Sequence, residues 1–167
     1  ELVPGMRPAR RVLHVDGADG PVRVLSVDDK EINRVLLRDM LEKVGFEVRD
    51  AADGAEAVRI FESWHPQLVL MDMRMPVMDG YEATRRIKAL PGGADTPVVA
   101  VTASAFEDDE HEVLSAGVDG YVRKPFQWDD FFAEVARATG LRFVQGDEDR
   151  NARADPASGD APDATEP

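Results

Sequence analysis

Residues 22–45 read VRVLSVDDKEINRVLLRDMLEKVG, and this stretch decides the fold. It opens with a run of β-branched and apolar residues that ends in two acids, Asp28 and Asp29. The segment after the acids has helical spacing and stops at Gly45, a typical helix C-cap. Its apolar residues on one helical face are Ile32, Val35, Leu36 and Met40. The stretch therefore predicts a strand, an acidic turn and an amphipathic helix.

The same alternation of strand and helix patterns continues along the chain. Strands are predicted over 46–51, 67–72, 97–103 and 120–124, and helices over 53–64, 80–90, 106–117 and 128–140. Asp53 and Glu56 form a capping-box-like start for the first of these helices. Five strands alternating with five helices predict an α/β fold, with a doubly wound five-stranded parallel sheet covered on both faces.

The two flanks of this unit have a different composition. Residues 11–17, RVLHVDG, echo the strand RVLSVDD, but they run into the turn-rich GADGP and no helix follows. We expect 1–20 to be a linker, with this echo as a short extended piece against the sheet edge or a neighbouring domain. Residues 145–167 hold seven acids against two arginines, and we expect a disordered acidic tail. The folded domain is then 21–144.

Composition excludes several classes of function. The net charge of -13 argues against binding to nucleic acid or to an anionic membrane. The absence of cysteine excludes disulfides, thiol nucleophiles and thiolate metal sites. No apolar run is long enough to span a membrane, and we expect a cytoplasmic location. The first residue is Glu1 rather than Met, so we expect a piece of a longer protein.

Hydrophilic side chains follow four of the five strands, and parallel strands bring such residues to one rim of the sheet. They are Asp28 with Asp29, then Asp72, Thr102 and Lys124. Carboxylates crowded on one rim repel one another unless a cation lies among them. Oxygen ligands of this kind are what Mg²⁺ prefers. With the ion bound, Asp72 could attack phosphorus, while Lys124 and Thr102 contact the phosphoryl oxygens.

The chain resembles a response-regulator receiver domain over about residues 22–139. The resemblance rests on VLSVDDKEINRVLL, LVLMDMRMPVMDGYEATRRIK, VVAVTASA and GYVRKPF, in this order. It implies the flavodoxin-like (βα)5 receiver fold and a cis bond before Pro125. It also implies the following roles: Asp72 as phosphoacceptor, Asp28, Asp29, Asp72 and the Arg74 backbone carbonyl as ligands of Mg²⁺ (Mn²⁺ possible in its place), Thr102 and Tyr121 as switch residues, and Lys124 as the phosphoryl-binding lysine.

The subtype most similar to this chain is the receiver of hybrid histidine kinases. Residues 2–13 resemble the linker that follows an ATP-binding domain in those proteins. The resemblance implies phosphotransfer from a kinase dimerisation domain or a histidine phosphotransfer protein, and an effector or parent kinase domains as downstream partners. No histidine of the chain stands in a phosphoacceptor context, and no kinase core is present.

Two other functions are compatible with parts of the pattern. A pseudo-receiver would keep the fold and act by docking alone. A Mg²⁺-dependent phosphatase with an aspartyl nucleophile would need a second acid two residues after Asp72, and Arg74 stands there.

Overall fold

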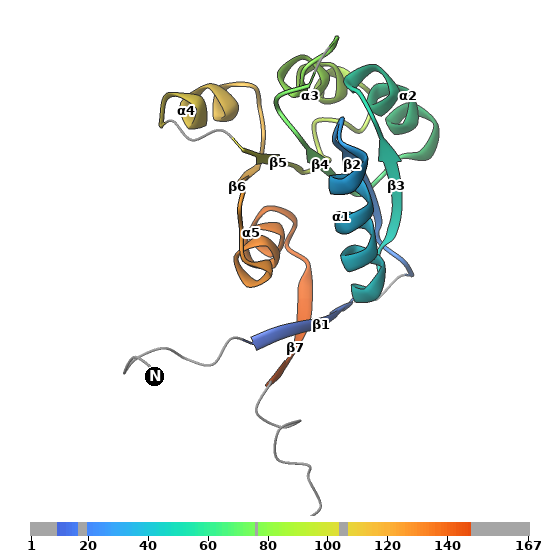
Figure 1. Cartoon of the computed structure of the whole chain (residues 1–167). Helices are drawn as coiled ribbons and strands as arrows, with labels where there is room; N and C mark the ends of the chain where they lie inside the picture. The colour runs from blue at the N-terminus through green and yellow to red at the C-terminus, as the bar shows by residue number, and fades with distance from the viewer. Residues whose placement is uncertain (1–9, 17–19, 76, 104–106, 148–167) are drawn as a thin grey trace, which may run out of the picture.

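A computed structural model describes residues 10–16, 20–75, 77–103 and 107–147 of the chain (Figure 1). Its centre is a five-stranded sheet in the order β3-β2-β4-β5-β6, with every neighbouring pair parallel. The strands are β2 (Arg23–Val27), β3 (Glu47–Ala51), β4 (Leu68–Met71), β5 (Val98–Thr102) and β6 (Gly120–Arg123). The predicted five-stranded parallel sheet is confirmed.

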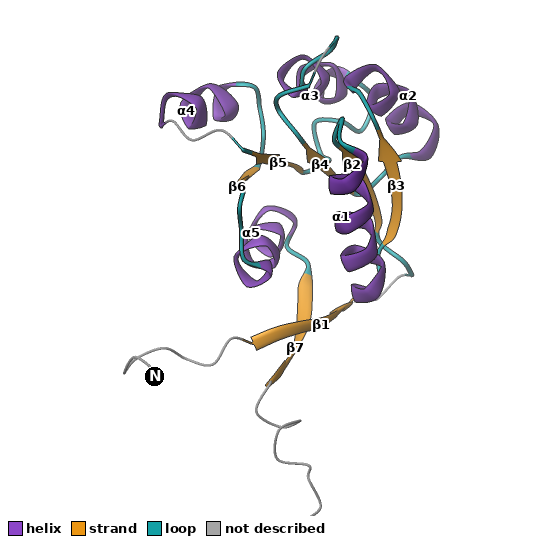
Figure 2. Ribbon diagram, in the orientation of Figure 1, coloured by secondary structure: helices purple, strands orange, loops and turns teal. Residues whose placement is uncertain are grey.

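Five helices cover the sheet, and Figure 2 shows them against the strands. They are α1 (Glu31–Val44), α2 (Gly54–Trp64), α3 (Gly80–Ala89), α4 (Glu107–Ser115) and α5 (Trp128–Thr139). One apolar cluster joins the sheet to α2, α3 and α4, and a second joins it to α1 and α5. The sheet is therefore wound on both faces, as the sequence predicted.

The strands carry side chains into both clusters. Leu25 packs in the cluster beneath α2, α3 and α4, while its neighbour Val24 packs in the cluster beneath α1 and α5. Successive side chains of a strand point to opposite faces, so a strand buried on both faces reads as a continuous apolar run. This is the pattern that LVLM of β4 showed in the sequence.

Local capping also follows the sequence. Gly45 ends α1 with a left-handed φ of 108°. Asp53 accepts a hydrogen bond from the Glu56 N–H at 2.8 Å, and the Glu56 carboxylate accepts one from the Ala52 N–H at 3.1 Å. The predicted N-cap bond of Asp53 is therefore present, and the return bond of Glu56 goes to the residue before the N-cap.

The segment expected to be a linker contains a strand. β1 (Arg10–Asp16) pairs antiparallel with β7 (Arg142–Asp147) in a separate two-stranded sheet. Phe143 of β7 contacts the rings of Phe46 and Phe132, at centroid distances of 6.0 and 5.2 Å. β7 also runs past Gln145, the expected start of the acidic tail. The partner of β1 comes from the opposite end of the chain, so no local pattern could indicate it.

Residues 148–167, most of the expected tail, lie outside the described residues. Among the helices that the structure describes, none is long and apolar enough to cross a membrane.

Candidate functional site

The site lies at the carboxyl ends of the central strands. The chain leaves β2 for β3 on one side and reaches β4 on the other, so the strand order reverses between β2 and β4. Ligands of open parallel sheets bind at such a switch point. Asp28 and Asp29 directly follow β2, and Asp72 directly follows β4. The N–H of Asp72 donates to the Val27 carbonyl at 2.9 Å, which ties the two strand ends together.

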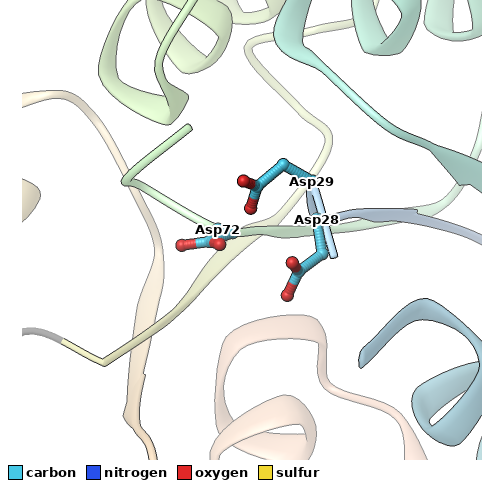
Figure 3. Close-up of side chains that lie close together, drawn as sticks. All are labelled: Asp28, Asp29 and Asp72. Carbon is cyan, nitrogen blue, oxygen red and sulfur yellow. The ribbon is translucent and has the colours of Figure 1, made fainter. Parts of the chain in front are cut away.

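The three predicted carboxylates come together at this place (Figure 3). One oxygen from each of Asp28, Asp29 and Asp72 lies within 4.8 Å of the others. Lys124, the residue after β6, reaches the same cluster, and its Nζ lies 2.8 Å from Asp28 Oδ2. Three carboxylates near a single lysine leave an excess of negative charge. An all-oxygen donor set with this charge fits a divalent cation such as Mg²⁺.

The electrostatics of Asp72 reflect this crowding. Its pKa is raised from 3.8 to about 6, first because burial disfavours the charged carboxylate, and also because Asp28 and Asp29 repel it. The backbone N–H of Arg74, which donates to Asp72 Oδ1 at 3.2 Å, and the charge of Lys124 act in the opposite direction. A cation placed among the three carboxylates would lower this pKa and keep Asp72 ionised.

Asp28 is the most constrained of the three acids, with only 6% of its surface exposed. Its Oδ1 accepts from the Lys30 N–H at 2.9 Å. Its Oδ2 accepts from Lys124 and from the Asn33 side-chain amide, at 2.8 and 3.1 Å. Its backbone carbonyl accepts from the Arg34 guanidinium at 2.8 Å. The first turn of α1 thus holds both the side chain and the backbone of Asp28.

The two predicted switch residues lie on the neighbouring strands β5 and β6. Thr102 ends β5 and is fully buried. Its carbonyl accepts from the Lys124 N–H at 2.8 Å, which fixes the end of β6 beside the end of β5. Tyr121 lies on β6 and is half-buried against the cluster beneath α2, α3 and α4. The bond between Lys124 and Pro125 is cis, as the resemblance implied.

Sequence reasoning missed three residues that shape the site. Asn33 and Arg34 hold Asp28, and Gly80 begins α3 in contact with the end of β4. A Cβ on Gly80 would lie 2.3 Å from the Asp72 carbonyl oxygen, so only glycine permits this approach. The position of Asn33, one turn into the helix that follows the acidic pair, was the available signal for its role.

A groove of about 330 Å³ opens beside the acids, between α1 and the loop that leads into α5. Asp28, Asn33 and Lys124 form its polar end. The apolar part is lined by Leu36, Leu37, Phe126 and Trp128, among others. The site is therefore continuous with an accessible apolar surface.

Comparisons with known proteins agree with this geometry. The model of the response regulator receiver domain family matches residues 24–136. The chemotaxis protein CheY of Halobacterium salinarum is 44% identical over 106 residues, which cover 63% of this chain and 86% of that protein. The sensor histidine kinase RcsC of Escherichia coli is 41% identical over 106 residues, but these cover only 11% of the kinase.

A solved structure gives the same result. The receiver domain of sensor histidine kinase PA1611 from Pseudomonas aeruginosa, with a magnesium ion coordinated in its active site cleft, matches with a TM-score of 0.68 and 37% identity. The match covers 72% of this chain and 99% of that domain. Motif order, sheet topology and the acidic site at the switch point agree, and the chain belongs to the response regulator receiver domain family of two-component signalling.

Proposed function

We propose that Asp72 accepts a phosphoryl group from a phosphohistidine on a partner protein, in a Mg²⁺-dependent reaction. The observation that carries the proposal is the meeting of Asp72 with Asp28, Asp29 and Lys124 at the switch point of the sheet. Phosphoryl transfer depends on positioning and on charge neutralisation rather than on acid–base groups. This cluster offers both, because it places a carboxylate nucleophile beside a site for a metal ion and beside the ammonium group of Lys124.

The proposed metal ligands are Asp28, Asp29, Asp72 and the backbone carbonyl of Arg74. Mg²⁺, or Mn²⁺ in its place, would offset the repulsion between the Asp72 carboxylate and an incoming phosphoryl group. The chain itself contributes the orientation of the ligands. The N–H of Arg74 fixes one Asp72 oxygen, and Asp28 is fixed through both of its side-chain oxygens.

Lys124 and Thr102 are proposed to bind the phosphoryl group once it is on Asp72. Lys124 must exchange its contact with Asp28 for the new dianion, which offers it a stronger charge-assisted hydrogen bond. Thr102 would donate its hydroxyl, and Tyr121 would move inward as Thr102 shifts. Such a change requires that the phosphoryl group bind one conformation better than the other.

The partner is proposed to be a kinase dimerisation domain or a histidine phosphotransfer protein. The support is the apolar groove beside the acids together with the exposed apolar residues Ile32 and Leu36 on α1, which are 76% and 62% exposed. A helix bundle that carries a phosphohistidine could cover this surface and present its histidine to Asp72. The output surface is proposed on α4, β6 and α5, where Tyr121 lines a second groove with Phe126 and Glu134.

The wider context is also a proposal. We infer that the chain acts in the cytoplasm as the receiver of a hybrid histidine kinase, and that it signals to an effector or to domains of that kinase. Its net charge of -13 supports protein partners rather than nucleic acid or membrane lipid.

Incubation with acetyl phosphate and Mg²⁺, followed by intact-protein mass spectrometry, tests the proposal. We expect a single phosphoryl adduct that hydroxylamine removes and that is absent in Asp72→Asn. Absence of an adduct, with a phosphorylated histidine protein as donor as well, would establish the docking pseudo-receiver instead. Sustained hydrolysis of a small phosphate ester would establish the phosphatase.

A further inference from the structure

The first turn of α1 supplies Asp28 with a donor that has no part in the phosphotransfer roles described above. The side-chain amide of Asn33 donates to Asp28 Oδ2 at 3.1 Å. Lys124 Nζ donates to the same oxygen at 2.8 Å. We propose that Asn33 is a positioning residue for the metal site. It orients Asp28 for Mg²⁺ together with Lys124 before phosphoryl transfer, and it keeps that orientation after Lys124 has turned to the phosphoryl group. The inference rests on the proposed function, because it requires both metal binding and the movement of Lys124.

The three donors to the Asp28 carboxylate are not equivalent. Lys30 uses its backbone N–H, which almost any residue at that position would also provide. Lys124 is a cation, and it must turn to the phosphoryl group for the proposed reaction to proceed. Asn33 is then the side-chain donor that remains on Oδ2, among the residues that the structure describes. Without it, a carboxylate that is 6% exposed would keep only the bond to Oδ1.

The chemistry of Asn33 suits a metal site better than that of a second lysine or arginine. Lys124 and Arg34 already bring two positive charges to Asp28, and a further cationic donor would add to their repulsion of a divalent cation. The neutral amide orients the carboxylate without adding positive charge. Removal of a hydrogen-bond donor that orients a metal-ligating side chain commonly weakens metal affinity by about 10- to 100-fold. Asn33 also lines the groove beside α1, so a bound partner would cover it and exclude water from its contact with Asp28.

Calorimetric titration of the whole chain with Mg²⁺ tests the proposal. In Asn33→Ala and in the near-isosteric Asn33→Leu, we expect the Kd for Mg²⁺ to rise by about 10-fold or more. Asn33→Gln keeps the amide donor and should recover most of the affinity. Ser63→Ala is the matched control, because Ser63 is an uncharged polar residue on the exposed side of α2, away from the acids and from the groove beside α1. Its Kd for Mg²⁺ should equal that of the unmodified chain.

A second measurement separates positioning from a structural or chemical role. Labelling by acetyl phosphate should be slow in Asn33→Ala at low Mg²⁺ and should return to the rate of the unmodified chain at saturating Mg²⁺. The urea unfolding midpoint without Mg²⁺ should stay close to that of Ser63→Ala. Unchanged Mg²⁺ affinity in both Asn33→Ala and Asn33→Leu would overturn the proposal, and so would a labelling defect that persists at saturating Mg²⁺. If the unmodified chain binds no Mg²⁺, the proposed function fails as well, and that result is visible before any variant is measured.

Discussion

Replacement of Asp72 by asparagine tests the electrostatic description of the site. The pKa of Asp72 is raised from 3.8 to about 6, mainly by burial and then by the neighbouring acids Asp28 and Asp29. The folded chain therefore binds the Asp72 proton more tightly than the unfolded chain does. Between pH 4 and pH 6 this difference lowers the stability of the metal-free domain as the pH rises. Above pH 6 the full loss of stability from ionised Asp72 is present.

The rise from 3.8 to about 6 corresponds to about 3 kcal/mol. Solvent reaches the open side of the site and reduces this cost of ionising Asp72, so we expect about 1–2 kcal/mol. Asparagine removes the charge, and its side-chain oxygen can still accept from the Arg74 N–H. Metal-free Asp72→Asn should thus be more stable than the unmodified chain by about 1–2 kcal/mol at pH 7.5.

Urea unfolding at pH 4 and pH 7.5, in the presence of a chelator, measures the effect. Other carboxylates also titrate in this range, so the quantity to follow is the difference between the two proteins at each pH. We expect almost no difference at pH 4 and the full difference at pH 7.5. Saturating Mg²⁺ should reduce the difference, because the ion stabilises the unmodified site more than the asparagine site. A variant that is less stable than the unmodified chain at pH 7.5 would refute the reasoning.

Three further changes have expected results that follow from the structure. Val77 has a left-handed φ of 72° and is fully exposed, so its backbone is strained and its side chain makes little contact. Val77→Gly should therefore raise the free energy of unfolding by up to about 1 kcal/mol. An unchanged urea midpoint would mean that the backbone at this position is not strained. Gly80→Ala should lower the free energy of unfolding by about 1–3 kcal/mol and weaken Mg²⁺ binding, because the new Cβ would displace the end of β4. A variant with unchanged stability and unchanged Mg²⁺ affinity would argue against this close contact. Phe143→Ala should lower the stability by about 2 kcal/mol because its ring contacts are lost, while Val144→Ala on the exposed side should lower it little. Thermal unfolding compares the two variants. Equal losses of stability would mean that β7 does not pack as described.

Much of the fold was predictable because its strands and helices carry local signals. Three such signals specify an element without knowledge of its partners: the continuous apolar run of β4, the glycine that ends α1 and the N-cap bond of Asp53. The meeting of Asp28, Asp29 and Asp72 was predictable for a different reason. Once the strands are parallel, residues that follow them must share one rim of the sheet.

The β1 and β7 pair could not be predicted in this way. Its two strands come from opposite ends of the described chain, and the register is interrupted between Val12 and His14. Besides its pairing with β1, β7 is held by Phe143, which contacts Phe132 on the preceding helix α5 and Phe46, a residue far away in sequence. Pairings of this kind depend on tertiary packing, and a short apolar segment does not specify its partner.

The apolar spacing of α1 predicted the helix correctly, but it did not show which side of the helix packs against the sheet. Ile32 and Leu36 lie on the apolar face predicted from the spacing, yet both are exposed, and full burial begins only at Leu41. The first turns contact the strand ends mainly through polar side chains instead, although Leu37 also packs against the core. Arg34 bonds to the Asp28 carbonyl, and Arg38 pairs with Asp50 of β3. Because polar residues secure this half of α1 to the strand ends, its apolar residues remain available at the surface beside the acidic site. A partner bound there would contact the same helical turn that holds Asp28, so docking and the metal site meet in one element of the fold.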